Sequence, residues 1–116
     1  MLRLAGSFTV FIRVAVLPVR LFLDDVRETP AGWLRAFTAS EAISLLAAGG
    51  ISEVSLDHDL GPPEAGTGYD VTVWIEEQAA SGTLAPISWA IHSANPVGRA
   101  RMEAALLSAE RFWNSQ

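Results

Sequence analysis

Acidic and imidazole side chains follow three short apolar runs in this sequence, and each polar group stands where its run ends. The three groups are Asp24-Asp25, Asp57-His58-Asp59 and His92-Ser93. Charge is costly to bury, so acids and histidines at the exits of core strands need a reason to be there. Ligands of an open parallel α/β sheet bind just beyond the carboxyl ends of its strands. Three such strands would deliver these groups to one site.

The acids of these groups have the chemistry of a cation site. Two carboxylates about 4 Å apart repel by roughly 4 kcal/mol at an effective dielectric of 20. A fold tolerates this repulsion if a cation sits among them or a proton is shared. Oxygen ligands suit Mg²⁺ or another divalent cation, which keeps waters and bridges to phosphate. The predicted metal ligands are Asp24, Asp25, Asp57 and Asp59, in preference to a plain turn after the first strand.

The chain has two histidines, and both stand at proposed strand ends. An unperturbed imidazole titrates near pH 6.5, so either could act as a general acid or base. His92 is the stronger candidate because Ser93 and Asn95 follow it. His58 stands between two acids, where it could simply position or neutralise them. Two alternatives stay open: one histidine is structural, or both form a zinc site with one Asp.

The segment after the last strand has the features of an anion site. Asn95 followed by proline is typical of a helix start, and free amides at a helix amino end bind anions. Ser93 and Asn95 are therefore candidate phosphate-binding residues. Arg99, one turn into the helix, could reach a phosphate bidentately, and Arg27 is a second candidate. The alternative for both arginines is a solvated surface position.

Strand and helix signals alternate along the chain. We expect strands at residues 19–23, 33–37, 54–57 and 87–91, and helices at 38–48, 69–80 and from 95 onward. Such alternation implies a parallel sheet with right-handed crossovers. We expect about four strands, with the strands that lead to Asp24 and Asp57 adjacent in the middle.

Length and composition limit the class of protein. A chain of 116 residues fits one domain and can fold without a disulfide or a metal staple. Cysteine is absent, which excludes thiolate ligands and fits a cytoplasmic location. The net charge of −5 argues against a general nucleic-acid backbone binder, although a local basic pocket is compatible with it. All eight basic residues are arginine, so no mechanism that needs a lysine can operate.

The first 18 residues are apolar, yet they do not have the pattern of a signal peptide or a membrane span. Arg13 interrupts the run, and a span needs about 20 apolar residues. We therefore expect no membrane partner. We interpret residues 1–18 as an extra strand or a loosely ordered extension that precedes one domain over residues 19–116.

Taken together, these motifs resemble the cyclic-phosphate processing receiver domain, a divergent branch of the receiver superfamily of two-component signalling. The matching segments are residues 21–27, 32–33, 41–43, 55–61, 67–70, 74–76 and 92–99. Receivers end their first strand with an acidic pair, their third with a phosphoacceptor Asp and their fourth with Ser or Thr. The chain departs from receivers in having no lysine after a fifth strand and too short a first loop for their first helix.

The resemblance implies a three-layer, receiver-like (flavodoxin-like) α/β sandwich. It also implies activity on cyclic phosphates, such as nucleotide or RNA-end 2′,3′-cyclic phosphates. We accordingly predict a Mg²⁺-assisted phosphodiesterase whose catalytic residues are His92, His58 and Asp57, with Asp57 as a transient phosphoryl acceptor in one variant. The alternatives are a non-catalytic receiver-derived module that binds a nucleotide or a protein, and an ordinary response regulator.

Overall fold

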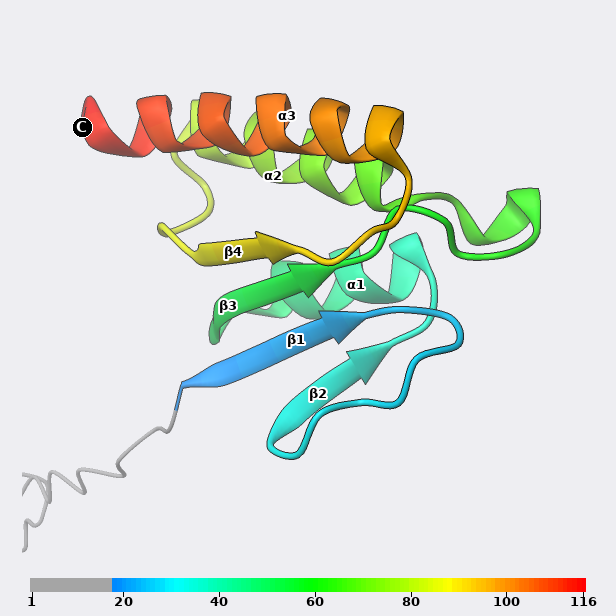
Figure 1. The fold of residues 1–116 in the computed structure, drawn as a ribbon. Helices are drawn as coiled ribbons and strands as arrows, with labels where there is room; N and C mark the ends of the chain where they lie inside the picture. The colour runs from blue at the N-terminus through cyan, green and yellow to red at the C-terminus, as the bar shows by residue number, and fades with distance from the viewer. Residues whose placement is uncertain (1–17) are drawn as a thin grey trace, which may run out of the picture.

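The computed structural model describes residues 18–116, which form a four-stranded parallel sheet and three helices (Figure 1). The strands are β1 (Val19–Leu23), β2 (Trp33–Ala36), β3 (Ile51–Leu56) and β4 (Ser88–Ile91). The helices are α1 (Ala39–Ala48), α2 (Gly68–Ser81) and α3 (Pro96–Asn114), with a short 3₁₀ turn η1 (Pro63–Ala65). The sheet order is β2-β1-β3-β4, which confirms the predicted α/β fold and its two central strands.

The interpretation of residues 1–18 falls outside the described residues, except at Pro18. Within the described part of the chain, no helix is long and apolar enough to cross a membrane.

Threonine caps begin the first two helices. Thr38 Oγ1 accepts a hydrogen bond from the Glu41 amide at 3.2 Å, whereas the Glu41 carboxylate accepts from the Phe37 amide rather than from the cap itself. At α2 the exchange is reciprocal. Thr67 Oγ1 accepts from the Asp70 amide, and Asp70 Oδ2 accepts from the Thr67 amide at 2.9 Å. Two orphan amides are satisfied in this way, which fixes the direction in which α2 leaves the end of β3.

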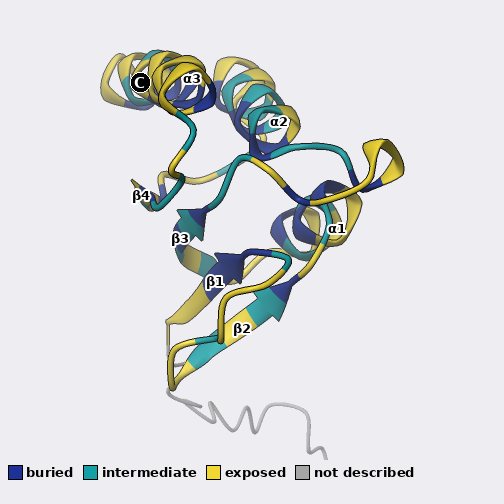
Figure 2. Cartoon of the chain, turned by 45° about the vertical axis from the view of Figure 1, so that its right-hand side comes forward, coloured by how far each residue is buried: buried dark blue, intermediate teal, exposed yellow. Residues whose placement is uncertain are grey.

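All three helices pack on the same face of the sheet. The fully buried side chains Leu21, Leu23, Val54 and Leu56 form one core with buried residues of α1, α2 and α3. The crossovers from β2 to β3 and from β3 to β4 run in the same direction, so right-handed connections place α1 and α2 on one side. Figure 2 shows α3 beside α2 on that side.

The structure differs from the predicted sandwich in its third layer. The connection from β1 to β2 runs in the opposite direction and would carry a helix to the second face, but residues 24–32 contain none. Within residues 18–116, therefore, no helix covers this second face, which we call the open face (Figure 2).

Side chains of the open face are aligned in rows across the four strands, because alternate residues of each strand point to the same face. In the order β2, β1, β3, β4, the rows are Trp33, Arg20, Glu53, Ser88; then Arg35, Phe22, Ser55, Ala90; and at the rim Phe37, Asp24, Asp57, His92. The rim row lies one residue past the strands. Ladder bonds continue to it, as in the 3.0 Å bond from the Asp57 amide to the Leu23 carbonyl.

Gly68 allows the start of α2 to approach this rim, and its replacement provides a test of the packing. A Cβ at Gly68 would lie 1.9 Å from the Asp57 carbonyl oxygen and 2.7 Å from Met102 Cε. Alanine normally favours a helix over glycine by about 1 kcal/mol. Here we expect Gly68→Ala to destabilise the fold by roughly 2–3 kcal/mol in urea unfolding, because the Asp57 carbonyl belongs to the backbone and cannot yield easily.

Gly82→Ala is the control for this test. A Cβ there meets nothing within 4 Å, and only its positive φ of 72° opposes alanine. We expect a cost of about 1 kcal/mol or slightly more from Gly82→Ala. A Gly68→Ala protein as stable as the parent would contradict the described packing of α2 against Asp57.

Candidate functional site

Three side chains from different strand ends meet at the rim of the open face. Ligand atoms of Asp24, Asp57 and His92 all lie within 4.8 Å of one another. His92 Nε2 is 2.9 Å from Asp24 Oδ2 and so joins the end of β4 to the end of β1 across β3. The structure thus brings together one member of each of the three polar groups that were predicted to converge.

Asp24 is fully buried, yet its surroundings favour the ionised form. Its Oδ1 accepts hydrogen bonds from the amides of Val26 and Arg27 at 2.9 and 2.8 Å. Burial alone would raise the pKa of Asp24, but these two amides and the contact with His92 outweigh it and lower that pKa. Asp24 is therefore a fixed negative charge at the base of the site.

Asp57 responds to the same environment in the opposite way. Burial raises the pKa of Asp57, and the negative charge of Asp24 adds to the rise, although the amide of His58 partly offsets it with a 2.8 Å hydrogen bond. The two carboxylates thus differ, one held ionised and one more easily protonated. A pair of acids whose pKa values are pushed apart is typical of sites that carry out acid–base chemistry.

Two residues that the sequence analysis did not assign to the site hold the ring of His92. Phe22 stacks on it with ring centroids 4.6 Å apart and an interplanar angle of 5°. Ser55 Oγ lies 2.8 Å from His92 Nδ1. A carboxylate can only accept, so Nε2 carries the proton toward Asp24, and in the neutral ring Nδ1 accepts from Ser55. Both residues precede a rim acid by two positions, and strand periodicity could have identified them.

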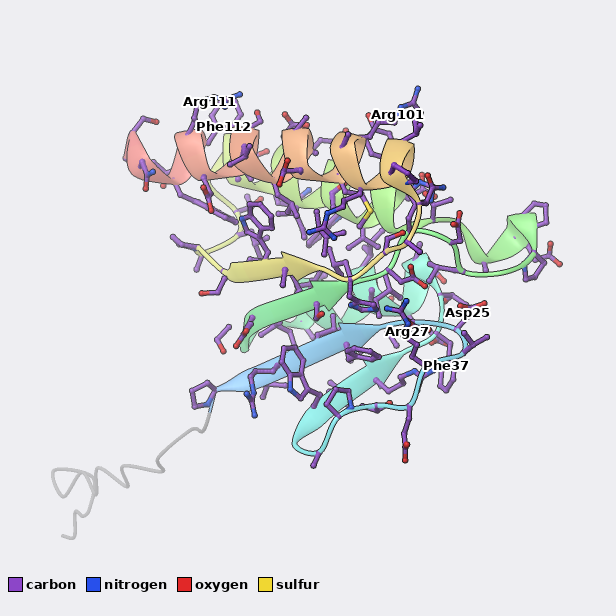
Figure 3. All side chains as sticks on the ribbon, in the orientation of Figure 1. Asp25, Arg27, Phe37, Arg101, Arg111 and Phe112 are labelled. Atoms are coloured by element: carbon purple, nitrogen blue, oxygen red, sulfur yellow. The ribbon has the colours of Figure 1, made fainter. Side chains whose placement is uncertain are left out.

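Arg27 is the cation closest to the three-residue group. Its Nη1 donates to the carbonyl of His92, and its Nε lies 3.8 Å from Asp24 Oδ2. The side chain is half exposed, so it remains accessible to a ligand. Figure 3 shows Arg27 beside Asp25 at this end of the sheet. Asp25, although predicted as a metal ligand, is not part of the group with Asp24 and Asp57.

His58, Asp59 and Asn95 form a separate cluster. His58 Nδ1 is 2.9 Å from Asp59 Oδ1, and this hydrogen bond is the main reason that the pKa of Asp59 is lowered. Asn95 Nδ2 lies 3.3 Å from Asp59 Oδ2. Among the described residues, the one group close enough for a metal contains neither His58 nor Asp59. The geometry therefore supports neither Asp59 as a fourth ligand nor a zinc site shared by both histidines.

The start of α3 is less open to an anion than the sequence suggested. Asn95 Oδ1 accepts from the Gly98 amide at 3.0 Å, and the Asn95 carbonyl accepts from the Arg99 amide. Arg99 Nη1 donates to the carbonyl of Ile91 at 2.6 Å, and Ser93 Oγ accepts from the Asn95 amide. The expectation of free amides was wrong at these two positions, because the cap and the next turn use them. Ser93 and Arg99 brace the connection from β4 to α3.

Comparison with known proteins identifies the family. The family model described as cyclic-phosphate processing receiver domain matches residues 19–108, from the start of β1 into α3. The chain belongs to the cyclic-phosphate processing receiver domain family. No curated protein and no solved structure matches the chain. The rim group of Asp24, Asp57 and His92 lies inside the matched region.

The opposed pKa shifts of the two acids predict stability changes of opposite sign. The lowered pKa of Asp24 stabilises the fold above its unfolded pKa near 3.9, and this contribution is lost as the pH falls through the folded value. Asp24→Asn should therefore reduce the free energy of unfolding at neutral pH by about 1–3 kcal/mol, because the hydrogen bonds from the Val26 and Arg27 amides lose their charge assistance. The deficit should shrink in acid.

The raised pKa of Asp57 has the reverse effect. Its stabilising contribution is complete below the unfolded pKa and is lost as the pH rises through the folded value, so ionised Asp57 costs stability at neutral pH. Asp57→Asn keeps an oxygen for the His58 amide and should raise the melting temperature at neutral pH, with the gain disappearing in acid. Thermal unfolding of both variants across pH checks this, and changes of the same sign at neutral pH would contradict it.

Proposed function

We propose that this receiver-family domain processes cyclic phosphates at the rim of the open face, with a divalent cation held by the carboxylates of Asp24 and Asp57 beside His92. The observation that carries the proposal is the convergence of two carboxylates and an imidazole within 4.8 Å. The family's name supplies the class of substrate, a cyclic phosphate. Nucleotide or RNA-end 2′,3′-cyclic phosphates are the members of that class that we favour.

The donor set fits a divalent cation. Two carboxylates at this separation repel by roughly 3.5 kcal/mol at an effective dielectric of 20, and a cation would offset that repulsion. Carboxylate oxygens suit Mg²⁺ or Mn²⁺, and the imidazole of His92 beside them remains available for proton transfer. When bound, such an ion would polarise the phosphoryl oxygen and make water a better nucleophile.

The protein's own residues supply proton transfer and phosphate binding. Opening the cyclic ester forms one bond from a water oxygen to phosphorus and breaks one bond from phosphorus to a ribose oxygen. The water must lose a proton and the ribose oxygen must gain one. His92, whose two nitrogens are already oriented by Asp24 and Ser55, is placed to exchange protons. The half-exposed guanidinium of Arg27 is placed to bind a phosphate oxygen.

The test is turnover of 2′,3′-cyclic mononucleotides with Mg²⁺ or Mn²⁺, with the phosphomonoester product followed by phosphorus NMR. We expect His92→Ala and Asp57→Asn each to lower kcat by about a hundredfold or more, because the first removes the acid–base group and the second a carboxylate that would hold the cation. We expect Arg27→Ala mainly to raise KM. Arg111→Ala, on α3 away from the rim (Figure 3), is the control that should leave turnover unchanged.

Absence of turnover with both cations, or turnover in His92→Ala and Asp57→Asn that equals the parent's, would remove the enzymatic proposal. The alternative is then a non-catalytic receiver-derived module that binds a nucleotide or protein and responds to occupancy. Its support is the absence of lysine from the chain, since a receiver's lysine normally balances the charge of its phosphoryl group. A thermal shift caused by the cation without any turnover would favour the module.

A further inference from the structure

An arginine and an aromatic ring stand next to the rim group on β2. Phe37 occupies the rim row beside Asp24 and is 50% exposed, so its ring is accessible to a ligand. The Arg35 guanidinium lies 4.3 Å from the centre of the Phe37 ring. Arg35 Nε also donates to the Asp24 carbonyl at 3.0 Å, so this pair is fixed directly against the site. Figure 3 shows Phe37 at the same end of the sheet as Arg27.

A second pair of the same kind lies two rows lower. The Arg20 guanidinium covers the Trp33 ring at 4.9 Å from its centre. Arg20 precedes Asp24 by four residues along β1, which corresponds to about 13 Å. Phe22 connects the two levels, because it meets the Trp33 ring edge-on at 6.4 Å and stacks on His92. An aromatic path therefore runs from Trp33 to the rim.

Arginines gather on this half of the open face, beside and below the rim acids Asp24 and Asp57. The chain carries −5, yet three of its eight arginines, Arg20, Arg27 and Arg35, stand on or beside β1 and β2. Glu53 is the one acid in the two lower rows. In residues 18–116 no helix covers these side chains, so nothing in the described fold accounts for such a surface.

We infer that the substrate is the end of a single-stranded RNA, an inference that rests on the proposed function. Bases stack on aromatic rings and on arginine guanidinium planes, and arginines pair with the phosphate backbone. The terminal nucleotide would place its cyclic phosphate at the rim and its base against Arg35 and Phe37. The next nucleotide would lie against Arg20 and Trp33. A mononucleotide reaches the first pair only, and a 2′,3′-cyclic phosphate requires ribose, which selects RNA over DNA.

Binding of a short fluorescein-labelled single-stranded RNA with a 3′-phosphate end, measured by fluorescence anisotropy, tests the inference without turnover. We expect Phe37→Leu to weaken binding about tenfold, since one stacked base is lost. Arg20→Ala should weaken it by roughly fivefold and reduce its salt dependence. A 3′-mononucleotide, used as an unlabelled competitor, should be affected by Phe37→Leu and not by Arg20→Ala.

The matched controls are Phe112→Leu and Arg111→Ala, which remove an exposed ring and a charge from α3 (Figure 3). Both should bind RNA like the parent, and circular dichroism melting checks that every variant folds. The inference would be overturned if Phe37→Leu and Arg20→Ala lost no more RNA affinity than the two control variants. It would also be overturned if unlabelled RNA competed no better than the mononucleotide. The open face would then belong to another occupant, such as a second copy of this chain.

The two proposals fail in different ways. RNA binding that depends on Phe37 and Arg20, without turnover under any cation, would remove the enzymatic function and keep the RNA surface. Turnover of cyclic mononucleotides, together with RNA binding that does not depend on Phe37 or Arg20, would keep the enzymatic function and remove the RNA surface. If both hold, KM for an RNA with a cyclic end should rise in Arg20→Ala while kcat stays near the parent value.

Discussion

The hydrogen bond between His92 Nε2 and Asp24 Oδ2 is the constraint on which the site depends. It crosses the whole width of β3 and joins residues 68 positions apart in sequence. Asp24 is fully buried, so removing its partners would leave an uncompensated charge in the interior, which is strongly destabilising. The stacked ring of Phe22 and the hydroxyl of Ser55 hold the imidazole where this bond requires it. The same contacts that satisfy the charge therefore assemble the reactive group.

The missing helix between β1 and β2 links this constraint to function. A second helical layer would cover the row of Arg35, Phe22 and Ser55, and side chains there would have to be uniformly apolar. Without it, the sheet can carry an imidazole, arginines and exposed aromatic rings within reach of the rim. The departure from the usual layered receiver thus has one structural origin, a connection between β1 and β2 too short to form a helix.

The sequence predicted much of this molecule because its strongest signals are local. Apolar runs located the four strands, and their alternation with helices predicted a parallel sheet whose strand ends carry Asp24, Asp57 and His92 to one edge. The remaining site depended on side-chain geometry. Asp59 turns to His58 and Asn95 because Gly98 lets the His58 ring approach α3, where a Cβ would lie 2.4 Å from that ring. No periodic pattern encodes such an approach, whereas the positions of Phe22 and Ser55 were accessible from strand alternation.

Nitrogen-15 NMR of the two imidazoles during a titration with Mg²⁺ tests the central claim most directly, with His58→Gln to assign the signals. His92 shares the rim with both acids, whereas His58 lies in a separate cluster and provides an internal reference. The account predicts that the His92 signals shift with the cation, that those of His58 do not, and that Asp57→Asn abolishes the response. Signals of the two histidines that move together, or a His92 that does not respond at all, would contradict it.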